Sequence, residues 1–426
     1  MPNTVGQGWG PTVPQAGTAA AHERPRLGHR PLLDGVRGLA ILGVMFFHTQ
    51  PPLIQGGMLG VDIFFVLSGF LITTIILEEW ATRGSVSLKR FYFRRALRLL
   101  PALVLLLLAI AALAVTTSAL GVEYEDRQTP IWLAILATLF YQSNWVWGFD
   151  LFGLGPLEHT WSLSIEEQFY ILWPPILIMM LRRGLDRRVM LTLIGVGVVA
   201  SGLWRLHVWQ HATTWERPYT GLDTRGDALL IGCGLAVLFT AGWLPTGKWG
   251  RGILRLAATL ATGVLIGFIA TSRTESDHLY QGGFTAVAVA TAVVIACLLV
   301  DPPRMATRVL SFMGLVWIGR ISYGLYLWHL PVSRAVEKLP IPNALAAPLQ
   351  FGLSILVAAL SYVYVERRFL RLKDRLQPAE RPSETTPAGT NRPASPLPTA
   401  HRVSSSGVLD SSPSAAAAVR WVMPAA

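Results

Sequence analysis

Cysteine is nearly missing from this sequence, and charged residues are few. Cys233 and Cys297 are the only two cysteines among 426 residues, and each lies inside an apolar run. The sequence therefore predicts neither a disulfide framework nor a metal site. Charged residues make up 14% of the chain, well below the roughly 25% that is usual in soluble domains. An ordinary soluble protein is excluded.

An apolar leader is also missing at the start of the chain. Residues 1–30 are polar and rich in Gly, Pro and Ala, so we expect a disordered arm there rather than a cleavable signal peptide. Residues 377–426 are rich in Pro, Ser, Thr and Ala, which predicts a disordered cytoplasmic tail. One membrane domain, residues 31–376, is expected between these two segments.

Long apolar runs are abundant. Hydrophobic residues make up 52% of the chain, the mean hydropathy is +0.45, and many runs are long enough for a helix to cross a hydrocarbon core of about 30 Å. The sequence predicts an all-α, polytopic membrane bundle with about ten transmembrane helices. The expected spans are 34–50, 59–77, 99–118, 165–181, 189–208, 226–241, 253–271, 281–300, 312–332 and 346–366.

Basic residues alternate from loop to loop along the chain. With the N-terminus inside, twenty-three Lys and Arg fall in inner segments and six in outer loops. This distribution is the positive-inside pattern, so both termini are expected in the cytoplasm. It also explains the net charge of +11 by orientation in a lipid bilayer, with no need for a nucleic-acid partner.

The aromatic, apolar stretch 131–147 does not fit this alternation as a further span. Counting it as a crossing would turn every later basic loop outward. We therefore expect a re-entrant or interfacial helix on the outer side, which is tolerated where it packs against protein. An ordinary spanning helix remains the alternative.

Arg37 and His48 lie on one expected helix, eleven residues apart. That spacing is close to three turns, so both side chains share a face about 16 Å apart. Ionisable residues inside a membrane helix indicate a functional site. The alternative is that both merely mark the ends of the helix. Further along, Arg94, Arg95 and Arg98 enter the third span; they suit phosphate oxygens, or anchor the helix to lipid head groups.

Polar side chains also gather at the outer side. Asp62 lies near the depth of His48 and would fix its tautomer, or would complement a helix dipole. The stretch LEHTWSLSIEEQFYILWP (157–174) suits hydroxyl recognition, although interfacial Trp and Tyr are also routine anchors. Of its adjacent Glu166 and Glu167, at most one is expected to face the interior. Ser322, Tyr326 and His329 form one polar stripe that would line a channel.

Cations are thus expected at the inner mouth and imidazole and carboxylate groups at the outer. This arrangement suits an anionic cosubstrate that is held from the cytoplasm and extends its reactive end through the protein. A separation of about 16 Å is on the order of an extended pantetheine arm.

Five motifs carry a resemblance to a known family: LDGVRGLAILGVMFFH, GVDIFFVLSGFLI, FRRALRLLP, HTWSLSIEEQFYILWP and ISYGLYLWH. Together they resemble the acyltransferase 3 family of bacterial multipass membrane O-acyltransferases, over about residues 30–370. The resemblance implies a ten-helix domain in the bacterial cytoplasmic membrane with acyl-CoA, in particular acetyl-CoA, as the donor. It implies transfer to a hydroxyl of a glycan, a lipid-linked sugar or a sugar-bearing metabolite. Some members carry a fused hydrolase-like domain, so a relay through such a domain would need a partner protein here.

The resemblance puts the family's arginine-to-histidine signature on Arg37 and His48, its arginine pair on Arg95 and Arg98, and its glutamate on Glu166. From these positions and the polar pattern together, we expect the following roles. His48 would act as general base or transient acyl carrier, with Asp62 or Glu166 orienting it, and the CoA phosphates would bind Arg37, Arg95 and Arg98. The acceptor would contact His159, Trp161, Ser164 and Tyr326. Two alternatives remain open: a transporter or flippase that uses the embedded charges as a path, and a non-catalytic scaffold.

Overall fold

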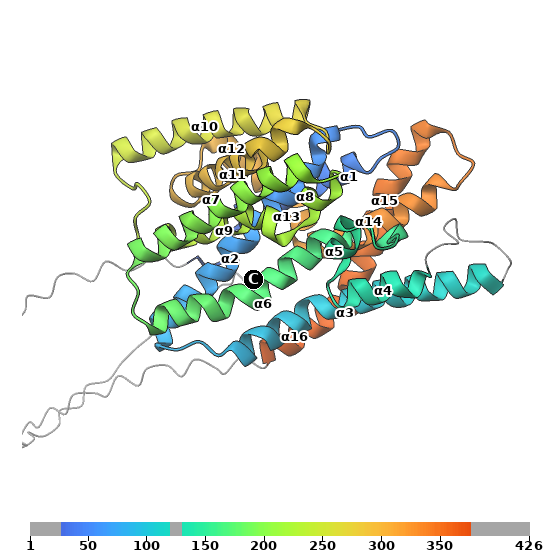
Figure 1. Cartoon of the computed structure of the whole chain (residues 1–426), viewed down its shortest axis with the longest axis horizontal. Coiled ribbons are helices and arrows are strands. Elements are labelled where there is room, and N and C mark those ends of the chain that lie inside the picture. Colours follow the sequence, from blue (N-terminus) through green and yellow to red (C-terminus); the bar gives the residue numbers. More distant parts are fainter. Residues whose placement is uncertain (1–26, 120–129, 376–426) are drawn as a thin grey trace, which may run out of the picture.

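The computed structural model describes residues 27–119 and 130–375, which form an all-helical bundle (Figure 1). The expected all-α fold is confirmed for this part of the chain. The expected tail 377–426 and most of the expected arm 1–30 lie outside the described residues.

Six helical segments are long and apolar enough to cross a membrane, judged by length and composition over the described residues. They coincide with six of the ten expected spans. They are Gln55–Arg83 (η1, Gln55–Leu59, with α2, Gly60–Arg83), Leu88–Thr116 (in α3, Leu88–Ala119), Arg187–His211 (α7), Lys248–Thr271 (α10), Leu279–Val300 (η3, Leu279–Gly283, with α11, Phe284–Val300) and Ala344–Leu372 (α15, Asn343–Ser361, with η4, Tyr362–Glu366, and α16, Arg367–Arg375).

The other four expected spans are helical but are shorter, interrupted or more polar. The span expected at 312–332 is two helices that meet at Ile321. These elements are α1 (Pro31–Phe47), α6 (Thr160–Arg182), α9 (Leu222–Thr240), α13 (Met313–Arg320) and α14 (Ser322–Glu337).

Helix α2 is the centre of the bundle and packs against α1, α6, α9 and α11. Its contact with α9 is a backbone approach between two glycines: a Cβ on Gly69 would lie 1.9 Å from the Leu229 carbonyl oxygen, and one on Gly232 would lie 2.1 Å from that of Val66. Small residues at membrane helix interfaces allow such close packing. An alanine at either position would force α2 and α9 apart.

The remaining helices surround this centre. In Figure 1, α10 lies along one side of the bundle and α3 with α16 along the opposite side, while α14 and α15 form one end. Helix α10 packs on α11, α1 packs on α13, and α14 contacts α15, α3 and α1. The short elements are α4 (Ile131–Leu139), α5 (Ser143–Gly148), η2 (Gly155–Leu157), α8 (Glu216–Thr220) and α12 (Arg304–Leu310).

The stretch 131–147 is broken into α4 and α5. The break falls near Tyr141, whose φ is 54°, and α4 has nine residues. Nine residues rise only about 14 Å, less than half of a hydrocarbon core. The alternative of one ordinary spanning helix is therefore wrong. Helix α5 packs on α6 and α8.

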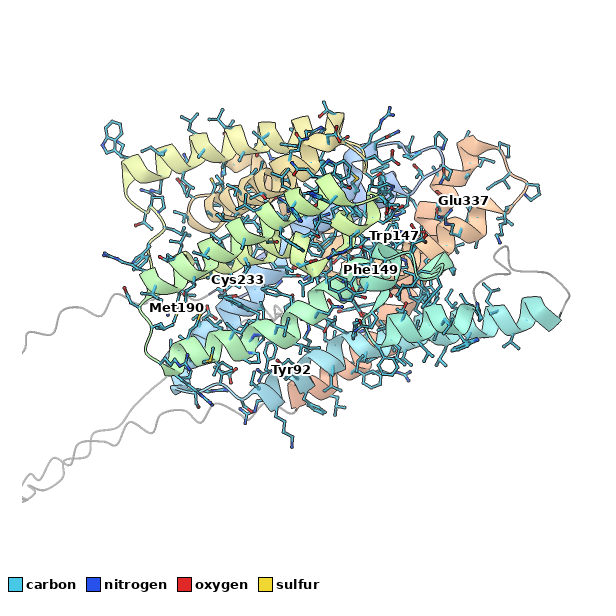
Figure 2. All side chains as sticks on the ribbon, viewed as in Figure 1. Tyr92, Trp147, Phe149, Met190, Cys233 and Glu337 are labelled. Carbon is cyan, nitrogen blue, oxygen red and sulfur yellow. The ribbon has the colours of Figure 1, made fainter. Side chains whose placement is uncertain are left out.

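Both cysteines are free and buried. Cys233 lies within α9 (Figure 2), with its Sγ 3.6 Å from the Gly69 carbonyl oxygen. Cys297 lies in α11 and contacts the Asp301 carbonyl oxygen at 3.6 Å. The Cys233 thiol thus lies between the backbones of α9 and α2, whereas the Cys297 thiol contacts the end of its own helix.

Candidate active site

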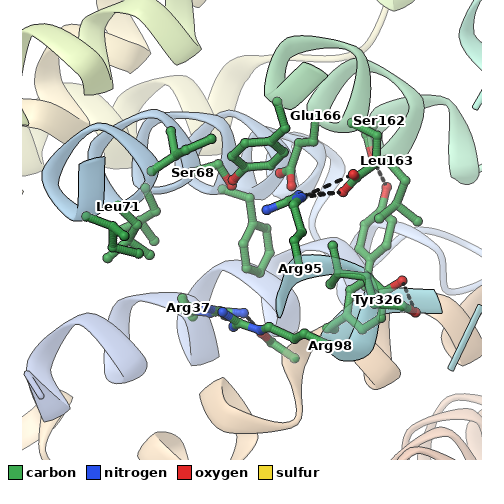
Figure 3. A pocket seen from close by; sticks show the side chains of 18 of the residues that line it. Arg37, Ser68, Leu71, Arg95, Arg98, Ser162, Leu163, Glu166 and Tyr326 are labelled. Carbon is green, nitrogen blue, oxygen red and sulfur yellow. Dashed lines mark hydrogen bonds and ion pairs between the residues drawn. The ribbon is translucent and has the colours of Figure 1, made fainter. Parts of the chain in front are cut away.

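Two interior cavities contain most of the predicted site residues. We name the first the arginine cavity; it has a volume of about 330 Å³ and is lined by α1, α2, α3, α6 and α14 (Figure 3). Its polar lining residues are Arg37, Ser68, Arg94, Arg95, Arg98, Ser162, Glu166, Glu167, Tyr170, Ser322, Tyr323 and Tyr326.

The arginines of this cavity differ in how their charge is balanced. Arg94 pairs with Glu79 at 3.2 Å, and Arg95 binds both carboxylate oxygens of Glu167. Arg37 donates to the Ser322 hydroxyl at 3.0 Å, and Figure 3 shows its side chain running toward Arg98. Among the described residues, neither Arg37 nor Arg98 has a carboxylate within ion-pair distance. Two guanidinium groups without a carboxylate at ion-pair distance therefore face one cavity, which favours an anionic ligand.

Glu166 and Glu167 both line the arginine cavity. The expectation that at most one of them faces the interior is therefore wrong. Adjacent helix residues point about 100° apart, but the cavity extends around a wide face of α6 and reaches both. Glu167 is occupied by Arg95, whose guanidinium carbon also lies 3.2 Å from the centroid of the Tyr170 ring.

The second cavity, which we name the histidine cavity, has a volume of about 260 Å³. Among its lining residues, most of the polar or aromatic side chains are aromatic rings, imidazoles or carboxylates. These residues are Phe47, His48, Gln50, Trp147, Glu158, His159, Trp161, Trp215, Tyr219, Thr274, Tyr326, Arg334 and Glu337.

His48 follows the last residue of α1. Its Nδ1 lies 2.9 Å from the Val44 carbonyl oxygen, and because a carbonyl can only accept, Nδ1 carries the proton. The Nε2 atom is then the basic nitrogen and keeps its lone pair. The His48 ring therefore has the tautomer that a general base requires.

A third histidine joins the two that line the cavity. The centroid of the His329 ring lies 5.0 Å from that of His48 and 5.2 Å from that of His159. His329 Nδ1 donates to the Tyr326 carbonyl oxygen at 2.6 Å, and its buried Nε2 has no hydrogen-bond partner. The sequence placed His329 in a polar stripe with Ser322 and Tyr326 but not in the predicted site. The signal that identifies it is this i, i+4, i+7 spacing.

His159 and Glu158 precede α6, and burial shifts the pKa of each side chain. His159 Nε2 donates to the Leu327 carbonyl oxygen at 3.1 Å, and its Nδ1 has no partner. Burial, with a further effect of His48, lowers the pKa of His159 to about 3, so the ring is neutral at ordinary pH. Burial also raises the pKa of the Glu158 carboxyl, against the opposing effect of Arg334.

Rings and charges surround the imidazoles. The centroid of the Trp161 ring lies 4.7 Å from that of Tyr219, and the Trp147 centroid lies 5.7 Å from that of Trp215. Figure 2 shows Trp147 toward the same end of the molecule as Glu337. Arg334 lies 3.6 Å from Glu337. The histidine cavity thus presents flat apolar faces beside hydrogen-bonding groups, the composition of a small-molecule site.

Tyr326 lines both cavities. Its hydroxyl lies 2.5 Å from the Ser162 Oγ and 2.9 Å from the His159 carbonyl oxygen. Within the described part of the chain, the only other residue that lines both is Val61. The two cavities therefore meet at this tyrosine.

Two predicted site residues lie outside these linings. Asp62 is buried and accepts from the Arg225 guanidinium at 2.6 Å; the guanidinium carbon of Arg225 lies 3.7 Å from the Phe284 ring centroid. Ser164 is buried and donates to the Thr160 carbonyl oxygen at 3.1 Å. Neither residue lines the arginine or the histidine cavity, so both contact protein groups rather than cavity space.

Comparison with known proteins identifies the family of this chain. The acyltransferase 3 model, described as an acyltransferase domain, matches residues 30–366. The peptidoglycan O-acetyltransferase OatA of Listeria monocytogenes is 35% identical over 349 residues, which cover 79% of this chain and 55% of OatA. The Bacillus subtilis protein named "Putative peptidoglycan O-acetyltransferase YrhL" is 34% identical over 353 residues, 79% of this chain and 54% of the relative.

This chain spans little more than half the length of these curated relatives. No solved structure matches it. The family match nevertheless covers most of the chain, and the expected resemblance is confirmed. The chain belongs to the acyltransferase 3 family and is homologous to bacterial O-acetyltransferases.

Proposed function

We propose that this protein is a membrane O-acyltransferase that moves an acetyl group from acetyl-CoA to a hydroxyl of a glycan. One observation carries the proposal. Helix α1 presents Arg37 to the arginine cavity and His48 to the histidine cavity, and the two cavities meet at Tyr326. Eleven residues of helix separate these ends by about 16 Å, a distance that an extended pantetheine arm can cover.

The donor phosphates would bind in the arginine cavity. Arg37 and Arg98 supply the uncompensated charge, and a guanidinium can hold phosphate oxygens in a bidentate manner. Arg95 is already bound to Glu167, so it can bind the donor only if it exchanges partners when the donor arrives. The positive-inside distribution of basic residues supports a cytoplasmic position for this cavity, on the side where acetyl-CoA is made.

The chemistry would occur at the other end of α1. His48 Nε2 takes the proton of the acceptor hydroxyl as its oxygen attacks the thioester carbon. The tetrahedral intermediate then collapses: the carbon–sulfur bond breaks, and the sulfur leaves with the proton returned from His48. The products are an ester and the free thiol of CoA, and the histidine is restored.

The histidine cavity would bind the acceptor. Trp161 and Tyr219 present ring faces on which the apolar side of a pyranose packs, while Glu158 and Glu337 accept hydrogen bonds from hydroxyls. The names of OatA and YrhL refer to peptidoglycan, which supports a cell-wall glycan as the acceptor. We place the protein in the bacterial cytoplasmic membrane, with the histidine cavity toward the outer face.

The test uses purified protein in lipid nanodiscs with radiolabelled acetyl-CoA and soluble glycan fragments. We expect saturable binding of acetyl-CoA and transfer of label to the glycan, with transfer lost in His48→Ala. In cells, mass spectrometry should show an acetyl-sized mass loss from the surface glycan of a deletion strain. A transporter or scaffold has no need for acetyl-CoA, so absence of both binding and transfer would overturn the proposal.

A further inference from the structure

The boundary between the two cavities falls at one level on several helices. On α2 both cavities share Val61, and on α14 both share Tyr326. On α6 the change occurs between consecutive residues, with Trp161 lining the histidine cavity and Ser162 the arginine cavity. A thioester that enters from the arginine cavity to meet His48 must therefore place its carbonyl group at this boundary.

The boundary carries a short chain of hydroxyl groups. Tyr326 donates to the His159 carbonyl oxygen at 2.9 Å, which uses its only proton. The Ser162 Oγ lies farther from this carbonyl oxygen, at 3.4 Å, so we assign the serine as the donor of its 2.5 Å contact with the tyrosine oxygen. A hydroxyl that accepts a hydrogen bond becomes a stronger donor. Of the two residues that line both cavities, Tyr326 alone can donate, because Val61 has no polar atom.

We propose that the Tyr326 hydroxyl is the oxyanion donor of the transfer reaction and that Ser162 is its positioning residue. This inference rests on the proposed function. When the acceptor oxygen attacks, the carbonyl oxygen of the thioester becomes negatively charged, and the Tyr326 O–H turns from the His159 carbonyl to this oxygen. When the carbon–sulfur bond breaks, the electron pair on the oxygen reforms the carbonyl. The tyrosine keeps its proton throughout.

The placement of Tyr326 suits this role. The centroid of its ring lies 5.3 Å from that of His329 and 5.5 Å from that of His159, and His329 in turn contacts His48. His48, the base, and Tyr326, the hydrogen-bond donor, are thus linked through the His329 ring near the boundary. A donor that is already oriented and shielded from water stabilises a developing negative charge far more than water does.

The experiment compares kcat and KM of three variants in nanodiscs. Tyr326→Phe keeps the ring that separates the cavities and removes only the donor, so kcat should fall by about 10²–10³-fold, with KM for acetyl-CoA nearly unchanged. Ser162→Ala should lower kcat less. Tyr92→Phe is the matched control: its hydroxyl also donates to a backbone carbonyl, that of Ile171 at 3.0 Å, but Tyr92 lies outside both cavity linings and should keep full activity.

Three results would overturn the inference. They are a Tyr326→Phe variant with unchanged kcat, a rise in KM alone, or an equal loss of kcat in Tyr92→Phe. Thermal melting of each variant identifies any loss that comes from misfolding, and Ser162→Ala provides a second measurement if Tyr326→Phe does not fold. If the wild-type protein transfers no acetyl group, the proposed function fails; if it does and Tyr326→Phe is equally active, only this inference fails.

Discussion

The arginine cavity and the histidine cavity are both lined by α1, and they differ in the charge of the side chains that face them. The first holds guanidinium groups, some of them paired with carboxylates of the cavity wall or its surroundings. The second holds imidazoles whose ring protons are bound to backbone carbonyls, as in His48, His159 and His329. A fixed charge suits the binding of an anion, whereas a neutral ring with a free lone pair suits proton transfer.

The difference teaches that one membrane helix can serve two tasks if its ends reach different environments. Arg37 presents a planar guanidinium, whose geometry suits phosphate oxygens, to a partly apolar cavity. His48 is useful only when it is neutral and its Nε2 is free. The following predictions test whether this division between binding and chemistry is real.

The largest effect is expected for His48→Ala, which removes the base from the histidine cavity. General-base catalysis contributes about 10²–10⁴-fold, so kcat should fall by that amount while acetyl-CoA still binds. Radiolabel transfer and equilibrium binding measure the two separately. His207→Ala on the exposed side of α7 is the matched control and should keep full activity; parallel loss of donor binding in His48→Ala would contradict the division.

A large effect on stability is expected for Asp62→Asn. It leaves the buried Arg225 guanidinium without its charged partner, and breaking a buried ion pair costs about 3–5 kcal/mol. Thermal unfolding in nanodiscs should show a clearly lower midpoint, together with a lower folded yield.

The control is Asp223→Asn, which loses a more exposed pair with Arg217 and should cost about 1 kcal/mol or less. If Asp62→Asn instead melted like the wild type and shifted only the pH dependence of transfer, Asp62 would act on His48 as the sequence predicts, and not on the fold.

A moderate effect is expected for Arg98→Ala, which removes uncompensated charge from the arginine cavity. A hydrogen bond to a charged group contributes about 1.5–3 kcal/mol, so the Kd for acetyl-CoA should rise roughly 10- to 100-fold. Competition binding measures this directly. Arg255→Ala on α10, which pairs with Asp301 near the surface, should bind normally. A fall in kcat with unchanged Kd would place Arg98 in the chemistry.

The smallest effect is expected for Glu167→Gln. This substitution weakens the ion pair with Arg95. The side chain of Arg95 is 20% exposed and that of Glu167 is 12% exposed, so the free energy of unfolding should fall by about 1–2 kcal/mol. The freed guanidinium should bind the donor more tightly. A lower melting midpoint combined with a lower Kd for acetyl-CoA checks both parts, and weaker donor binding would contradict the role of Glu167 as competing anion.

The sequence predicted features that depend on neighbouring residues of one helix. Spacing along α1 related Arg37 to His48, and composition indicated a helical membrane domain. It did not predict the partner of Asp62, because Arg225 lies 163 residues away and only tertiary packing joins them. For the same reason, His329 was seen as part of a stripe but not as a neighbour of His48.

The prediction of ten spans had a physical limit of the same kind. A test of length and hydropathy misses α1, α13 and α14, which have 17, 8 and 16 residues, although α2 and α3, which also line the arginine cavity, pass it. Glu166 and Glu167 illustrate the point on a smaller scale. Their angular separation was correct, but the width of the cavity they face is set by neighbouring helices.

The close packing of α2 and α9 at Gly69 and Gly232 has a consequence for how a donor can enter the protein. At each glycine, a carbonyl oxygen of the other helix occupies the space that a Cβ would need. Helix α2 therefore cannot slide along α9, and we expect a bulky donor to enter at the opposite flank of α2. There the ion pair between Arg95 and Glu167 joins α3 to α6. Tyr92 joins the same two helices through the Ile171 carbonyl oxygen, so we expect entry of a donor between α3 and α6 to require both contacts to break.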